Sequence, residues 1–104
     1  MTVKVAYPHI NEQDGEPARL AQHPRVRVAQ LAMDYLAHGW SVEEMCRQHP
    51  YLRPAEAHAA MAYYFDHQQT IDDEIRQELA EVDRLRTASG PSPFALRFRA
   101  KGLV

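Results

Sequence analysis

Six histidines and a single cysteine are the residues of this chain best suited to chemistry. Imidazole and thiolate groups bind zinc, but at characteristic spacings. His38, His49, His58 and His67 follow one another at intervals of 11, 9 and 9 residues, which fit no standard zinc pattern. Cys46 falls on the apolar side of its expected helix and is interpreted as a small buried hydrophobe. We therefore expect no metal site, and we interpret the histidines as scattered over the surface.

Other catalytic signatures are equally weak. The sequence has no glycine-rich phosphate loop, and no serine or cysteine stands in a sharp turn flanked by glycines. The acidic cluster Asp72-Asp73-Glu74 is of a type that binds cations, but acids in the first turn of a helix are explained by the helix dipole. We expect no catalytic residue and no cofactor, so the protein is not expected to be an enzyme.

Charge is distributed unevenly along the chain. The formal net charge is −2, yet residues 53–87 hold four Lys or Arg against eight Asp or Glu. Residues 88–104 hold three Lys or Arg and no acid. A basic end that follows an acidic helical segment indicates contact with an acidic partner surface. The alternative is that a basic terminus only keeps the protein in solution.

This basic end has the pattern of a strand with two unlike faces. Residues 88–93 have the composition of a linker, and apolar and basic residues then alternate. Such a segment cannot bury its apolar side alone, so we expect a flexible tail that is disordered in the free protein or docked onto a partner. The expected partner-binding residues of this tail are Phe94, Leu96, Arg97, Phe98, Arg99 and Lys101.

The rest of the chain is organised by helices, and the clearest helical signal is the junction from Gly39 to Glu44. Gly39 suits the left-handed residue that ends a helix. Ser41 suits the N-cap of the next helix, and Glu44 stands three residues later to complete a capping box. Two helices that meet across about three residues form a helix-turn-helix corner. The sequence therefore predicts a mainly α protein with a small trihelical core over residues 28–67.

Apolar periodicity gives the helices their expected bounds. The expected helices are residues 27–38, 42–48 and 54–67. Before them, residues 1–27 hold several prolines, which limit any strand to a short or edge strand. The β-prone runs there are residues 4–7, 18–21 and 25–28. We expect a short N-terminal β element.

A second apolar stripe follows, within an otherwise charged segment. Either the third helix continues past His67, or Thr70 caps a new helical extension over residues 70–87. The stripe must pack on a helix of the same chain or of a second copy, and we favour a homodimer. The residues of this dimer stripe are Ile71, Ile75, Leu79, Val82 and Leu85. Residues 1–87 then form one helical domain, and residues 88–104 form the linker and tail.

The helix-turn-helix corner raises an alternative function, a dimeric DNA-binding transcriptional regulator. The third helix suits the major groove poorly, because its polar residues include Glu56 and Asp66, which would face phosphates with the wrong charge. The better cations precede the helices. The expected phosphate contacts to operator DNA are Arg19, Arg25 and Arg27.

Two large aromatic residues stand at the corners between helices. Trp40 lies between the first and second helices, and Tyr51 between the second and third. Large aromatics at such positions usually cover the end of the core, so we expect both to be structural. A stacking platform for nucleic acid is the other interpretation.

Several segments, taken in order, resemble the family called domain of unknown function 433. The residues that carry the resemblance are Tyr7-Pro8-His9-Ile10, Gly15-Glu16-Pro17, Arg25-Val26-Arg27-Val28, His38-Gly39-Trp40-Ser41-Val42-Glu43-Glu44, His49-Pro50-Tyr51-Leu52 and Ala60-Met61-Ala62-Tyr63-Tyr64-Phe65-Asp66-His67. The resemblance covers roughly residues 7–75 and leaves out the tail. It implies a homeodomain-like trihelical core.

The resemblance also implies a role. Members of this family are often regarded as antitoxins of toxin–antitoxin pairs, typically with a PIN-like ribonuclease as the toxin. PIN-type nucleases hold Mg²⁺ or Mn²⁺ through clustered carboxylates, an acidic site that suits a basic tail. We therefore expect an antitoxin-like interaction protein that binds and neutralises such a nuclease. The single cysteine and the lack of a signal peptide or membrane span in the sequence favour a cytoplasmic protein.

Overall fold

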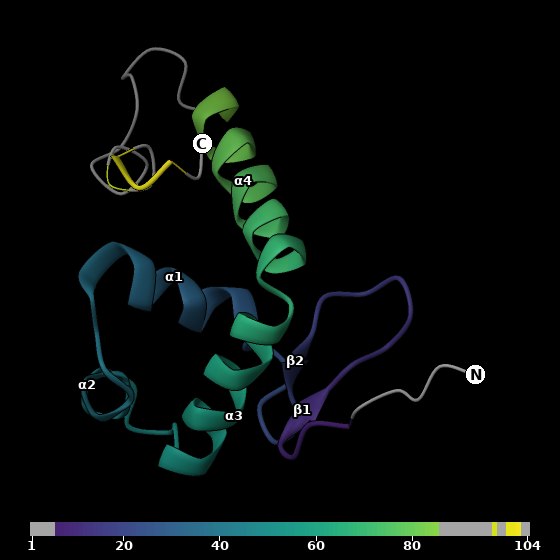
Figure 1. Ribbon diagram of the computed structural model, residues 1–104, viewed down its shortest axis with the longest axis vertical. Coiled ribbons are helices and arrows are strands. Elements are labelled where there is room, and N and C mark those ends of the chain that lie inside the picture. Colours follow the sequence, from purple (N-terminus) through teal and green to yellow (C-terminus); the bar gives the residue numbers. More distant parts are fainter. Residues whose placement is uncertain (1–5, 86–96, 98–99, 103–104) are drawn as a thin grey trace.

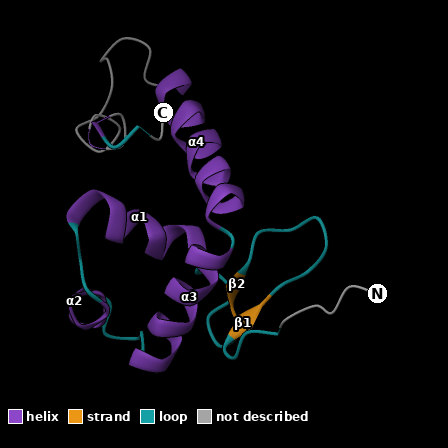
Figure 2. Cartoon of the chain, viewed as in Figure 1, coloured by secondary structure: helices purple, strands orange, loops and turns teal. Residues whose placement is uncertain are grey.

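The computed structural model describes residues 6–85, 97 and 100–102, and over these residues the chain is mainly helical (Figure 1, Figure 2). The strands are β1 (Ile10–Asn11) and β2 (Arg19–Leu20), and the helices are α1 (Val28–His38), α2 (Val42–Gln48), α3 (Pro54–Asp66) and α4 (Gln68–Leu85). The expected fold class, mainly helical with a short N-terminal β element, is confirmed. Among the described residues, no helix is both long and apolar enough to cross a membrane.

The β element begins later in the chain than the sequence indicates. The backbone N–H of Ile10 donates to the Tyr7 carbonyl at 3.3 Å, and His9 has a positive φ of 67°, so a tight turn precedes β1. Because of this turn, pairing starts at Ile10, which lies opposite Leu20 in the antiparallel sheet. The expected run 4–7 is therefore not the first strand over its described residues. The run 18–21 contains β2, and the run 25–28 contributes one bridge, between Arg27 and Arg19.

The corner between α1 and α2 forms as predicted, with one difference. Gly39 adopts the left-handed conformation, with φ 68°, and its N–H donates to the Tyr35 carbonyl at 2.9 Å. The Ser41 hydroxyl accepts a hydrogen bond from the Glu44 N–H at 3.1 Å. The Glu44 carboxylate, however, accepts from Arg47 and Gln48 instead of reaching back to the cap. The predicted capping box is therefore half formed.

α3 and α4 are separated by a single residue, His67, whose φ of −126° leaves helical geometry. Its ring stacks on Tyr63 with centroids 4.1 Å apart, and its N–H donates to the carbonyl oxygens of Tyr63 and Tyr64. The third helix thus does not continue unbroken. The predicted start at Thr70 is also wrong, because α4 begins at Gln68.

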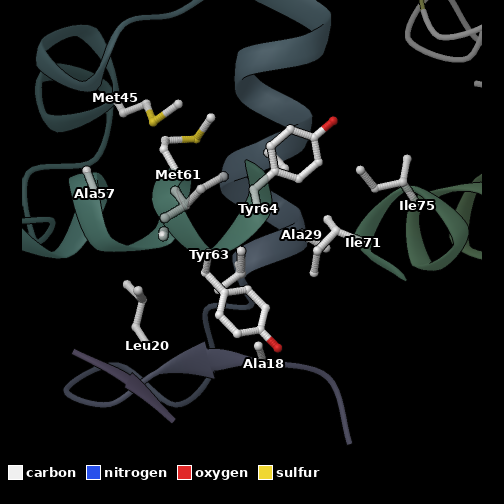
Figure 3. Close-up of a cluster of buried hydrophobic side chains, with 14 of the residues drawn as sticks. Ala18, Leu20, Ala29, Met45, Ala57, Met61, Tyr63, Tyr64, Ile71 and Ile75 are labelled. Atoms are coloured by element: carbon white, nitrogen blue, oxygen red, sulfur yellow. The ribbon is translucent and has the colours of Figure 1, made fainter. Parts of the chain in front are cut away.

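The first half of α4 belongs to the core of its own chain. Ile71, Ile75 and Leu79 are 2%, 0% and 5% exposed and cluster with buried residues of α1 and α3 (Figure 3). These three residues are used within the chain, so their assignment to a dimer stripe is wrong. The sequence alone could not distinguish packing within the chain from packing on a second copy, because an apolar stripe of this length suits a helix of either. Val82 is half-buried and Leu85 is 75% exposed.

Candidate functional site

The surface of α3 that points away from the core is small and apolar. We call α3 face the exposed residues Ala55, His58, Ala62 and Phe65 together with Tyr35 of α1. Phe65 is 52% exposed, and its ring meets that of Tyr35 edge to face at 5.6 Å. From residue 54 to residue 66 the sequence has no Lys or Arg. A helix that reads the major groove presents several Arg, Lys, Asn or Gln residues, so this face suits a protein contact better than base edges.

The three arginines expected to contact phosphates lie in different environments. Arg27 bridges to α4: its two terminal nitrogens lie 2.6 Å from Glu74 and 2.8 Å from Glu78. The expectation that Arg27 contacts phosphate is therefore wrong, because its charge is already paired within the fold. Arg19 donates a hydrogen bond to the Pro24 carbonyl at 3.1 Å. Arg25 is exposed.

Replacing Arg27 by alanine is expected to lower the free energy of unfolding by about 1–3 kcal/mol, since two charge-assisted hydrogen bonds are lost. Glu74 and Glu78 would then repel each other across one helical turn. Arg25→Ala is the matched control, and its effect should stay within about 0.5 kcal/mol because the side chain is exposed. Urea unfolding followed by circular dichroism measures both. Equal effects of the two substitutions would contradict the role given to Arg27.

Most of the tail lies outside the described residues. Of the six residues expected to bind a partner, Phe94, Leu96, Phe98 and Arg99 are outside, whereas Arg97 and Lys101 are described and exposed. A terminal nitrogen of Arg97 lies 3.1 Å from Nδ1 of His38, at the end of α1.

Five aromatic rings follow one another across both interhelical corners. We call them the ring row, and in spatial order they are His38, Trp40, His49, Tyr51 and His23. Consecutive ring centroids are separated by 4.8, 6.1, 5.7 and 5.1 Å. Trp40 packs partly against the core, in line with a structural role. Tyr51 is 44% exposed, so the expectation that it covers the core is wrong.

Two carboxylates lie beside histidines of the ring row. Asp34 Oδ2 lies 2.8 Å from Nε2 of His49. Glu56, whose side chain is fully buried, accepts the Arg53 backbone N–H at 2.9 Å through Oε1. Its Oε2 has no hydrogen-bond partner among the described residues and lies 3.8 Å from Nε2 of His23. Burial raises the pKa of Glu56, but the Arg53 backbone hydrogen bond and the nearby Arg53 and His23 outweigh it, so the pKa is lowered.

This lowered pKa makes stability depend on pH in a defined direction. A carboxyl with a lower pKa in the folded state stabilises the fold above its unfolded pKa, and that contribution disappears as the pH falls through the folded value. Glu56→Gln should therefore cost about 1 kcal/mol at neutral pH. The difference from wild type should shrink as the pH falls below the ordinary value of 4.5. Thermal unfolding at several pH values tests this, and a pH-independent difference would contradict it.

A cavity of about 330 Å³ opens at one end of the ring row. Its lining residues are Gln22, His23, Pro24, Arg25, Val26 and Tyr51. Most of its wall comes from the loop before α1, and Tyr51 comes from the corner between α2 and α3. The cavity therefore exists only because the N-terminal segment folds back onto that corner.

The remaining candidate residues lie apart from the ring row. His67 packs between Tyr63 and Tyr7, and His58 is exposed on the α3 face. Cys46 is partly buried against the core, and burial raises the pKa of its thiol. Within residues 6–85, 97 and 100–102, no three His, Cys, Asp or Glu side chains are arranged to hold a metal ion.

The spacing of the histidines gives no indication of the ring row, since it predicts histidines scattered over the surface. A partial signal exists, since His38 and Trp40 flank one corner and His49 and Tyr51 flank the next. Because the chain turns sharply at each corner, two rings that stand two residues apart there come to lie on the same surface. His23 has no such signal, because it joins Tyr51 only through the folding back of the N-terminal segment.

Taken together, the described fold is a small trihelical domain of the helix-turn-helix type, with a fourth helix packed on it. The family model described as a protein of unknown function (DUF433) matches residues 21–64. Over these residues the sequence matches the family that the resemblance indicated, although the match is shorter than the expected range 7–75. No curated protein and no solved structure matches the chain.

Proposed function

We propose that the protein is an antitoxin-like interaction protein that binds and neutralises a PIN-like ribonuclease. The observation that carries the proposal is the α3 face. The helix that would enter a DNA groove presents two alanines, His58, a half-exposed Phe65 and the exposed Asp66, and it has no Lys or Arg. Such a surface supports docking of a protein. The nature of the partner rests on the resemblance to family members regarded as antitoxins.

The charge of the tail supports the same proposal. Residues 88–104 carry three Lys or Arg and no acid, whereas a nuclease of this type has a carboxylate-lined metal site. Opposite charges of this kind select partners and speed association. The α3 face would dock the protein on the nuclease, and the basic tail would then occupy the acidic site. The single cysteine suits a protein that acts in the reducing cytoplasm.

A homodimer through the last turns of α4 is part of the proposal. The apolar residues left for it are Val82, which is half-buried, and Leu85, which is 75% exposed.

The second candidate function, a dimeric helix-turn-helix regulator that binds operator DNA, is favoured by one observation. Arg25 is exposed and has no acidic partner among the described residues, so it can meet a phosphate. Affinity based on phosphate contacts falls steeply with salt. Both roles are compatible with one antitoxin, since they use different surfaces.

Co-expression with a PIN-like ribonuclease tests the proposal. The two proteins should co-purify, and ribonuclease activity should be low in the complex and restored after separation. Phe65→Glu should weaken the complex, whereas Ala80→Glu, which also places an acid at an exposed apolar position, should leave it intact. A nuclease that stays active and unbound would exclude the antitoxin role, and tight, salt-sensitive binding to promoter DNA would then favour the regulator.

A further inference from the structure

We infer that the ring row and the cavity beside it bind single-stranded nucleic acid. One base would enter the cavity beside Tyr51, and neighbouring bases would lie against Trp40 and the histidines. This surface is distinct from the α3 face, and the inference does not depend on the proposed function.

The spacing of the rings is the first support. Consecutive ring centroids are 4.8–6.1 Å apart; His38 and Trp40 stack face to face, and the other three contacts are tilted or edge to face. Tyr51 is 44% exposed and His38 is exposed, while the other three rings are partly exposed. Proteins that bind single strands stack successive bases on aromatic side chains, and every base has a face for this contact.

The cavity is the second support. Its volume of about 330 Å³ lies at the lower end of the range for small-molecule sites, a size suited to a single ring system. The rings of Tyr51 and His23, Pro24 and Val26 supply flat or apolar wall. Gln22 adds an amide that can both donate and accept hydrogen bonds. A nucleobase binds in a pocket of this kind, which has apolar walls and few polar groups.

The placement of charge is the third support. Arg25 lines the cavity and has no acidic partner among the described residues. Arg53 follows Tyr51 by two residues; its Nε lies 3.4 Å from Glu56, and its side chain is still 60% exposed. Arg97 contacts His38 at the opposite end of the row. Cations thus stand at both ends of the aromatic surface. Such an arrangement tracks a phosphate backbone.

Two acids lie beside the row, and they differ in exposure. Glu56 is fully buried, 3.8 Å from Nε2 of His23, so it is closed off from a strand on this surface. Asp34 lies 2.8 Å from Nε2 of His49 and its side chain is 19% exposed, so it is the acid that a strand on the row would pass.

Other occupants explain less of the surface. An aromatic side chain of a partner protein would fill the cavity but leave the other rings without a function. Duplex DNA keeps its bases stacked inside, so it cannot use a row of rings. A single strand uses both the cavity and the row.

Trp40 supplies the measurement, because it is the single tryptophan of the chain and belongs to the row. The full chain should be titrated with a single-stranded RNA of about eight nucleotides, a length within the usual site sizes. Trp40 fluorescence should be quenched in parallel with a rise in the anisotropy of labelled RNA. The same sequence as a DNA duplex should bind more weakly and leave the fluorescence unchanged.

Two variants test the residues. Tyr51→Ala should weaken binding by at least about fivefold through the lost stacking contact, and Arg25→Ala should weaken it and reduce its salt dependence. Phe65→Ala, which removes an exposed ring of the α3 face, is the control and should bind like wild type. Circular dichroism verifies the fold of each variant, and both residues are exposed enough to be replaced without unfolding. Absent quenching, full binding by folded Tyr51→Ala, or preference for the duplex would each overturn the inference.

Discussion

Replacing Ile75 by alanine is expected to lower the free energy of unfolding by about 2–5 kcal/mol, the usual cost of a large-to-small change in a core. Ile75 is fully buried and belongs to the same cluster as Ile71 and Tyr64 (Figure 3). The substitution removes apolar contacts and leaves a cavity between α4 and the rest of the chain. Urea unfolding followed by circular dichroism gives the free energy.

Leu85→Ala is the matched control, since this leucine lies on the same helix but is 75% exposed. Its effect on stability should stay within about 0.5 kcal/mol. Light scattering gives the molar mass of both variants, so a change in association can be distinguished from a change in stability. A wild-type stability for Ile75→Ala with a halved mass would mean that the first half of α4 pairs with a second copy, against the packing described above.

The trihelical part of the fold could be predicted because its signals are local. Gly39 and Ser41 mark the corner by their own backbone and hydrogen-bonding preferences, and α2 begins and ends where the sequence indicates. The break at His67 could not be predicted in this way. It depends on the contact of the His67 ring with Tyr63 and Tyr7, and Tyr7 comes from a distant segment.

The place of α4 escaped prediction for a related reason. Its charged face includes Glu74 and Glu78, which look solvated in the sequence but pair with Arg27. The same contact removes Arg27 from the group of free cations. Arg27 is separated from Glu74 by 47 positions and from Glu78 by 51, and pairs so distant in sequence produce no periodic pattern. The wrong predictions for α4 and for Arg27 therefore have the same cause.

The two candidate surfaces also differ in whether local sequence or contacts between distant segments form them. Most of the α3 face could be anticipated, because four of its five residues belong to one helix, whereas Tyr35 comes from α1. The ring row needed the fold, since two corners and the loop before α1 supply its members. Glu56, interpreted in the sequence as a charge facing phosphates, is instead a buried carboxylate that caps α3 and faces His23.

Removing the tail after Thr87 is expected to leave the fold intact and to weaken inhibition of the cognate nuclease by at least about thirtyfold, the effect of losing one strong interface anchor. The buried core residues lie between Ala18 and Leu79, upstream of the cut, so the melting temperature should stay close to that of the full chain. Exposed charge pairs contribute well under 1 kcal/mol each. The arginines therefore matter only when the tail is buried against acidic groups.

A full-length variant with Arg97→Gln, Arg99→Gln and Lys101→Gln separates the charge of the tail from its apolar side. If charge neutralises the acidic site, this variant should inhibit poorly while still co-purifying through the α3 face. If the apolar side dominates, it should inhibit like wild type, and the truncated protein alone should fail. Inhibition by the truncated protein equal to that of the full chain would refute a role for the tail and leave the helical core as the inhibitory surface.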